Sequence, residues 1–268
     1  MSKESYLELT RIISPLIEKI DTNMRECVSA EERILITLRY LATGETFMSV
    51  SLYFARGEST VRKIIKESTE IIWNALKDIY MTIPTREQFK HIADRFELLW
   101  NLPNCIGALD GKHIRIEKFP NTDEAFPLSR NLLRPYSSRP LDNVKRIFNY
   151  RLNRGSKTIE CEFGMAAEKF AVLNGPIRCR DPTTVNNIIR APSILHNFVR
   201  KGEGIQYYPQ GEIYEIVEKP NNIETQDLVI HEASSVTNLR NYLANYFLSP
   251  RTCLPWQWKF AEPGNNMK

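Results

Sequence analysis

Residues 106–116 read IGALDGKHIRI. Small and apolar residues lead to one carboxylate, Asp110, then Gly and Lys follow, and isoleucines alternate with basic residues. This pattern predicts a strand, a tight turn and a second strand, with Asp110 at the end of a buried strand. A buried carboxylate costs several kcal/mol unless it is paired, hydrogen-bonded or bound to a metal. An aspartate that caps its own turn is the alternative interpretation.

Length and composition are those of an ordinary globular chain of one large or two modest domains. The 268 residues are 42% hydrophobic and 25% charged. The five cysteines show no CxxC or Cys/His spacing, which argues against zinc and for a reducing compartment. We expect an intracellular protein without a signal peptide, a membrane span or a membrane partner, because no apolar run is long enough.

Positive charge is concentrated in one part of the chain. Residues 130–180 hold 11 Lys/Arg and 4 Asp/Glu, a local charge of +7 within a total of +4. Such a patch suits a polyanion, and a solvated basic face is the alternative.

Hydrophobic spacing predicts a helical module before residue 84. Of the three helices predicted between residues 29 and 76, the last follows a Gly-bearing turn, which is typical of a helix-turn-helix. Its outward residues Arg62, Lys63 and Lys66 lie where a recognition helix meets bases or phosphates. Residues 31–78 hold 7 basic and 7 acidic side chains, so a structural or protein-binding bundle stays open. The predicted helices cover residues 4–23 with a break at Pro15, 29–43, 46–55 and 59–76.

The remainder of the chain predicts an α/β arrangement. We expect a helical helix-turn-helix module at 1–84, an α/β domain at 85–200, and an irregular connection with a terminal helix and Trp-containing tail at 201–268. The four histidines share no spacing and are interpreted as surface or packing residues. Further helices are predicted over residues 86–100, 157–173, 184–200 and 236–248.

Six motifs in order carry a resemblance that covers nearly the whole chain. They are LATG at 41–44, GALDGKH at 107–113, DEAFPL at 123–128, NLLRPY at 131–136, FNYR at 148–151 and IECEFG at 159–164. Together they resemble the PIF/Harbinger transposases and their host-domesticated, nuclease-like relatives.

The resemblance implies a DDE-type, RNase H-like domain, here truncated, with a three-carboxylate site for two Mg²⁺ or Mn²⁺ ions. The matching acids are Asp110, Asp123 and Glu160, which would ligate the ions and act in phosphodiester hydrolysis or transfer. It also implies a nuclear protein that binds DNA, with cytoplasm left open, and a separate Myb-like DNA-binding partner. The oligomeric state stays open, a homo-oligomer included. The expected DNA-binding residues are Arg62, Lys63, Lys66, Arg130, Arg134, Arg151 and Arg154.

The sequence departs from the family between its first two acids. Asp110 and Asp123 are only 13 positions apart, whereas the family separates them by a long segment with a third strand and a crossover helix. A parallel connection takes roughly a dozen residues or more for the crossover alone. Once the hairpin is built, only residues 117–122 remain. We therefore predict a degraded catalytic domain with absent or very weak nuclease activity.

Three readings of this departure compete. The retained acids favour a metal-dependent nuclease of transposase origin. The basic patch and the helix-turn-helix favour a non-catalytic DNA- or protein-binding adaptor, which would bind DNA in a salt-dependent way without metal. A transcript or gene sequence that lacks one exon is the third reading. The sequence does not identify a DNA target.

Overall fold

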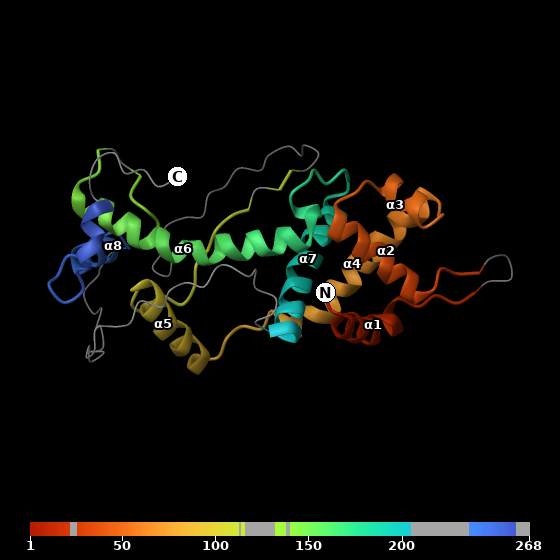
Figure 1. Ribbon diagram of the computed structural model, residues 1–268, viewed down its shortest axis with the longest axis horizontal. Helices are drawn as coiled ribbons and strands as arrows, with labels where there is room; N and C mark the ends of the chain where they lie inside the picture. The colour runs from red at the N-terminus through yellow and green to blue at the C-terminus, as the bar shows by residue number, and fades with distance from the viewer. Residues whose placement is uncertain (22–25, 113, 116–131, 138–139, 205–235, 261–268) are drawn as a thin grey trace. The chain divides into compact units, whose positions relative to one another are not determined.

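The computed structural model describes two compact units that are almost entirely helical (Figure 1). It describes residues 1–21, 26–112, 114–115, 132–137, 140–204 and 236–260. The first unit holds α1 to α4, the end of α6, η1 and α7, and the second holds α5, most of α6, α8 and η3. The helical elements are α1 (Lys3–Ile17), α2 (Ala30–Thr43), α3 (Phe47–Tyr53), α4 (Glu58–Tyr80), α5 (Arg86–Trp100), α6 (Asn143–Lys169), η1 (Ala171–Leu173), α7 (Pro182–Glu203), α8 (Val236–Tyr246) and η3 (Pro255–Phe260).

Local capping signals fix both ends of α2, as the sequence predicts, and the start of α3. The hydroxyl of Ser29 accepts a hydrogen bond from the backbone N–H of Glu32 at the start of α2. Gly44 ends that helix in the left-handed conformation, with φ of 66°. A side chain at Gly44 would also press against the backbone of Ala171 in η1. Thr46 caps α3 in the same way as Ser29 caps α2.

Helix α4 is the centre of the first unit. It packs against α1, α2, α3 and α7. Its buried face includes all five apolar residues that the sequence predicts, and the helix runs four residues beyond the predicted end. Helix α1 ends at Ile17, soon after Pro15, and not near residue 23 as predicted. The apolar residues on the buried face of α4 are Val61, Ile64, Ile65, Ile72 and Leu76.

The second unit has a smaller core around the N-terminal half of α6. The ring of Tyr136 packs edge-on against Phe148, with centroids 5.3 Å apart. The Asn149 side chain accepts a hydrogen bond from the backbone N–H of Tyr136 and donates one to its carbonyl, at 2.7 and 2.9 Å. The NLLRPY and FNYR motifs therefore pack together. The helix that the sequence predicts over 157–173 is the end of the longer α6, followed by η1.

The predicted α/β fold class is wrong for the described residues. The structure is 70% helix and 1% strand, with no sheet in the part that can be described. Residues 106–112 form no strand, and Ile106 and Leu109 are 52% and 57% exposed. An isolated two-stranded hairpin is at best marginally stable in water, and it needs further strands or a helix to bury one face. The 13 positions from Asp110 to Asp123 provide no chain for such strands.

None of the described helices is both long and apolar enough to cross a membrane. All five cysteines are free thiols.

Candidate functional site

The N-terminal half of α4 presents basic side chains on its outer face. Arg62, Lys63 and Lys66 are all exposed. The Arg62 guanidinium pairs with Glu58 at 2.6 Å, one turn earlier, and lies 4.4 Å from the ring centroid of Phe47 in α3. These contacts hold Arg62 close to the helix and to α3, which precedes the turn of the helix-turn-helix pattern.

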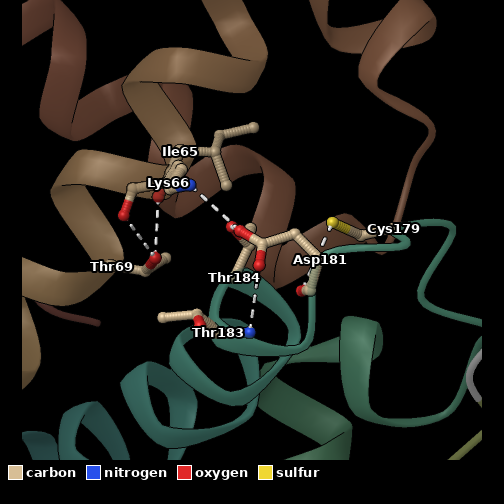
Figure 2. A network of polar contacts seen from close by, with 7 residues as sticks. All are labelled: Ile65, Lys66, Thr69, Cys179, Asp181, Thr183 and Thr184. Atoms are coloured by element: carbon tan, nitrogen blue, oxygen red, sulfur yellow. Dashed lines mark hydrogen bonds and ion pairs between the residues drawn. The ribbon is translucent and has the colours of Figure 1, made fainter. Parts of the chain in front are cut away.

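Lys66 joins α4 to the start of α7 through Asp181 (Figure 2). Its ammonium lies 3.0 Å from one carboxylate oxygen of Asp181, which also accepts a hydrogen bond from the Thr184 hydroxyl at 2.5 Å. The other oxygen accepts from the backbone N–H of Thr183 and so caps α7. The Thr184 hydrogen bond, followed by that from Lys66, lowers the pKa of Asp181 to about 2. The carboxylate is therefore ionised at neutral pH.

The segment before α7 lies beside α4 and adds two further basic residues. Asp181, which pairs with Lys66 of α4, directly follows this segment. Burial raises the pKa of the Tyr40 hydroxyl in α2, Cys179 raises it further, and the Arg62 guanidinium opposes this. Arg178 and Arg180 flank Cys179 and are exposed. The outer face of α4 and this segment therefore form one basic surface in the first unit.

A second charged cluster connects the end of α6 to α7. The buried His196 ring nitrogen Nε2 lies 3.0 Å from one oxygen of Glu162, and the Arg200 guanidinium pairs with the other. Burial raises the pKa of Glu162, but the hydrogen bonds from His196 and Arg200 outweigh it and hold that pKa below its usual value. His196 is thus a packing histidine, as predicted. Its pairing with Glu162 was not foreseen, although His196 and Arg200 are spaced to share one helical face.

Arg151, predicted to contact DNA, is buried in the second unit. Its guanidinium donates to the carbonyl oxygens of Asn101 and Thr252 and to the side-chain oxygen of Gln257, at 3.1, 3.4 and 3.1 Å. It also lies 4.5 Å from the ring centroid of Phe247. Burial lowers the pKa of Arg151 to about 10. These contacts make Arg151 a central packing residue of the second unit.

The other basic residues predicted in this region differ in exposure. Arg154 is half-buried and lies over the rings of Trp100 and Trp256, with burial lowering its pKa. Arg134 is exposed, and Arg130 lies outside the described residues. Their contact with DNA stays a prediction.

Two of the three predicted acids can be placed. Asp110 is exposed, which differs from the buried strand end that the sequence predicts. Glu160 is an exposed residue of α6, and Asp123 lies outside the described residues. An exposed carboxylate keeps its hydration, so Asp110 does not require a metal or a cation as compensation.

Comparison with known proteins identifies the middle of the chain. Residues 90–197 match the family described as DDE superfamily endonuclease. The chain carries a DDE superfamily endonuclease domain. This domain covers nearly all of the predicted RNase H-like region at 85–200. It includes most of α5, the whole of α6 and most of α7, so it contributes to both units. No solved structure matches the chain.

Two relatives from Arabidopsis thaliana support the DDE assignment. The protein Antagonist of Like Heterochromatin Protein 1 is 34% identical over 87 residues, which are 32% of this chain and 22% of the relative. An ALP1-like protein is 20% identical over 256 residues, covering 64% of this chain and 61% of the relative. The chain therefore spans less than two thirds of either relative. Both are derived from Harbinger transposases, which confirms the resemblance to that family.

A DDE family typically uses divalent metal ions. Among the described residues no three His, Cys, Asp or Glu side chains are grouped so that they could hold a metal ion. Asp110 and Glu160 do not by themselves fit a two-metal site, which needs several carboxylate oxygens around both ions. We therefore derive no catalytic step through metal ions.

Proposed function

We propose that this chain is a transposase-derived DNA-binding protein in which metal-dependent DNA cleavage is absent or very weak. The observation that carries the proposal is the distance of 13 positions between Asp110 and Asp123. An RNase H-like site places its first two acids on neighbouring parallel strands, which require a crossover of roughly a dozen residues or more. This chain has no room for that crossover after its predicted hairpin.

The alignment with the ALP1-like protein supports a shortened chain. The aligned 64% of 268 residues amounts to about 172 residues, yet the alignment has 256 positions, so about 84 positions of the relative face gaps in this chain. An error of about 1 Å in the position of a reacting group can lower the rate on the order of a hundredfold. Loss of a whole structural segment between the first two acids, which the family resemblance implies, would be a larger change than that.

The basic surface of the first unit supports retained DNA binding. Helices α2, α3 and α4 follow one another as in a helix-turn-helix, and the exposed basic residues of α4 occupy the half that would meet DNA. The name of the first relative says that it is an antagonist of Like Heterochromatin Protein 1. By analogy we propose a regulatory role on DNA in the nucleus. A Myb-like partner and self-association are further proposals.

Two assays on the full chain test this proposal. Salt-dependent binding of labelled duplex DNA is measured in EDTA, and nicking of supercoiled plasmid is measured with Mg²⁺ or Mn²⁺. We expect DNA binding in EDTA and no nicking beyond that of Asp110→Asn. Lack of DNA binding by the wild type contradicts the binding part of the proposal.

A weakly active nuclease is the second candidate, because Asp110 and Glu160 are both retained and exposed. Robust metal-dependent nicking that Asp110→Asn and Glu160→Gln each abolish would favour it. Nicking that persists in both variants would indicate a contaminating nuclease.

A further inference from the structure

Two segments far apart in sequence contribute basic side chains to the surface beside α4. Lys63 and Lys66 come from α4, and Arg178 and Arg180 come from the segment that leads into α7. The ion pair between Lys66 and Asp181 holds the two segments together.

We infer that Arg178 and Arg180 bind the phosphate backbone of duplex DNA together with Lys63 and Lys66. This inference rests on the proposed DNA-binding function and extends it beyond the predicted recognition helix. Half or more of the hydrogen bonds in protein–DNA interfaces go to phosphate and sugar, and these contacts position the protein. Arginine is suited to this role because its planar guanidinium matches the geometry of phosphate oxygens.

The charge balance of the surface favours an anionic partner. Arg62, Lys63, Lys66, Arg178 and Arg180 contribute five positive charges, and the nearby acids Glu58, Glu70 and Asp181 contribute three negative charges. These eight side chains sum to a charge of +2. The carboxylates of Glu58 and Asp181 are engaged by Arg62 and Lys66. Arg178 and Arg180 are exposed and add two positive charges beside these ion pairs.

Duplex DNA fits this surface better than a single-stranded nucleic acid does. Proteins that bind single strands stack the bases on exposed aromatic side chains. Of the two rings of α3 beside α4, Phe47 is buried, stacked on Tyr40 and covered by Arg62. The exposed ring of Tyr53 is covered by the Arg39 guanidinium at 3.7 Å. The surface thus offers cations to a phosphate backbone and keeps these rings from unpaired bases.

The test compares two double variants of equal charge. Arg178→Gln/Arg180→Gln removes two charges from the proposed surface, and Lys3→Gln/Lys201→Gln removes two exposed charges elsewhere on the first unit. Lys201 lies near the opposite end of α7 from Asp181, roughly 30 Å away at 1.5 Å per residue. All four residues are exposed, so the variants should fold, which circular dichroism and thermal unfolding verify.

Binding of a random-sequence duplex is measured by fluorescence anisotropy in EDTA, from about 50 to 200 mM salt. Each lost phosphate contact reduces the salt slope by about 0.9, so Arg178→Gln/Arg180→Gln should lower the slope by about 2 and the affinity by roughly tenfold to a hundredfold. The control should keep most of the wild-type slope. If both double variants weaken binding equally, the inference is wrong. Binding of duplex DNA by the wild type would still support the proposed function in that case. Tighter binding of single-stranded RNA than of duplex DNA also overturns it.

Discussion

Replacing Arg151 by Ala should destabilise the second unit. The side chain is 1% exposed and donates hydrogen bonds to the carbonyls of Asn101 and Thr252 and to the side chain of Gln257. Alanine would leave these acceptors without their donor and would open a cavity next to Phe247. The residue therefore connects the end of α5, the middle of α6 and the segment around η3.

The expected loss follows from two opposing contributions. A buried acceptor that loses its partner costs about 1–3 kcal/mol, and three acceptors are affected. Removing a buried cation offsets part of this loss of stability. Burial disfavours the charged form of Arg151 and lowers its pKa to about 10. We expect a net loss of about 2–4 kcal/mol for Arg151→Ala. Arg151→Met should lose less, because methionine fills most of the cavity.

Urea unfolding followed by circular dichroism measures these differences. Arg134→Ala is the matched control, because Arg134 is an exposed arginine of the same unit, and it should change stability by less than about 0.5 kcal/mol. DNA binding should depend little on Arg151 in variants that stay folded. An Arg151→Ala protein as stable as the control but with weakened DNA binding would refute the packing role.

Three further changes test the packing and the electrostatics. Gly44→Ala should cost about 2 kcal/mol by urea unfolding, because Gly44 has a φ of 66° and its new Cβ would meet the backbone of Ala171; an unchanged midpoint would contradict this. Gly155→Val should destabilise by about 1–3 kcal/mol, because the new side chain would overlap the buried Leu102. Gly155→Ala should cost less, because its single methyl group overlaps only the flexible end of the Leu102 side chain. Folding lowers the pKa of Glu162, so the ionised side chain stabilises the fold above pH 4.5, and this stabilisation is lost as the pH falls further. Glu162→Gln should therefore reduce the loss of stability at acid pH. An unchanged dependence of stability on pH would exclude the ion pair.

The helices could be predicted from the sequence because their signals are local. Ser29, Gly44 and Thr85 each end or begin a helix where the capping rules place them. The apolar stripe of α4 likewise follows from spacing alone. The first half of α6 was missed because its apolar residues pack against loops and α8, so no simple stripe marks it.

The predicted strands failed because a strand depends on partners elsewhere in the chain. Residues 106–116 have the alternation of a hairpin, but alternation does not supply the neighbouring strands that stabilise one. The short spacing between Asp110 and Asp123 was the stronger signal. It predicted that the chain cannot form the crossover connection of an RNase H-like sheet between these two acids.

The candidate site was predictable only in part for a similar reason. Lys66 could be placed on an outer helical face from spacing, but its partner Asp181 is 115 positions away and no local pattern connects them. The sequence did not predict that Arg151 is buried, because a stretch rich in basic residues is typical of an exposed surface. Its three hydrogen-bond acceptors lie in distant parts of the chain and keep the side chain buried.

Titration of the full chain with Mn²⁺, followed by electron paramagnetic resonance, tests the central claim most directly. The claim is that Asp110, Asp123 and Glu160 do not assemble into a two-metal site. We predict that the wild type and a variant with Asp110→Asn, Asp123→Asn and Glu160→Gln bind Mn²⁺ with the same weak affinity. Tight binding of two ions by the wild type that is lost in the variant would contradict the account.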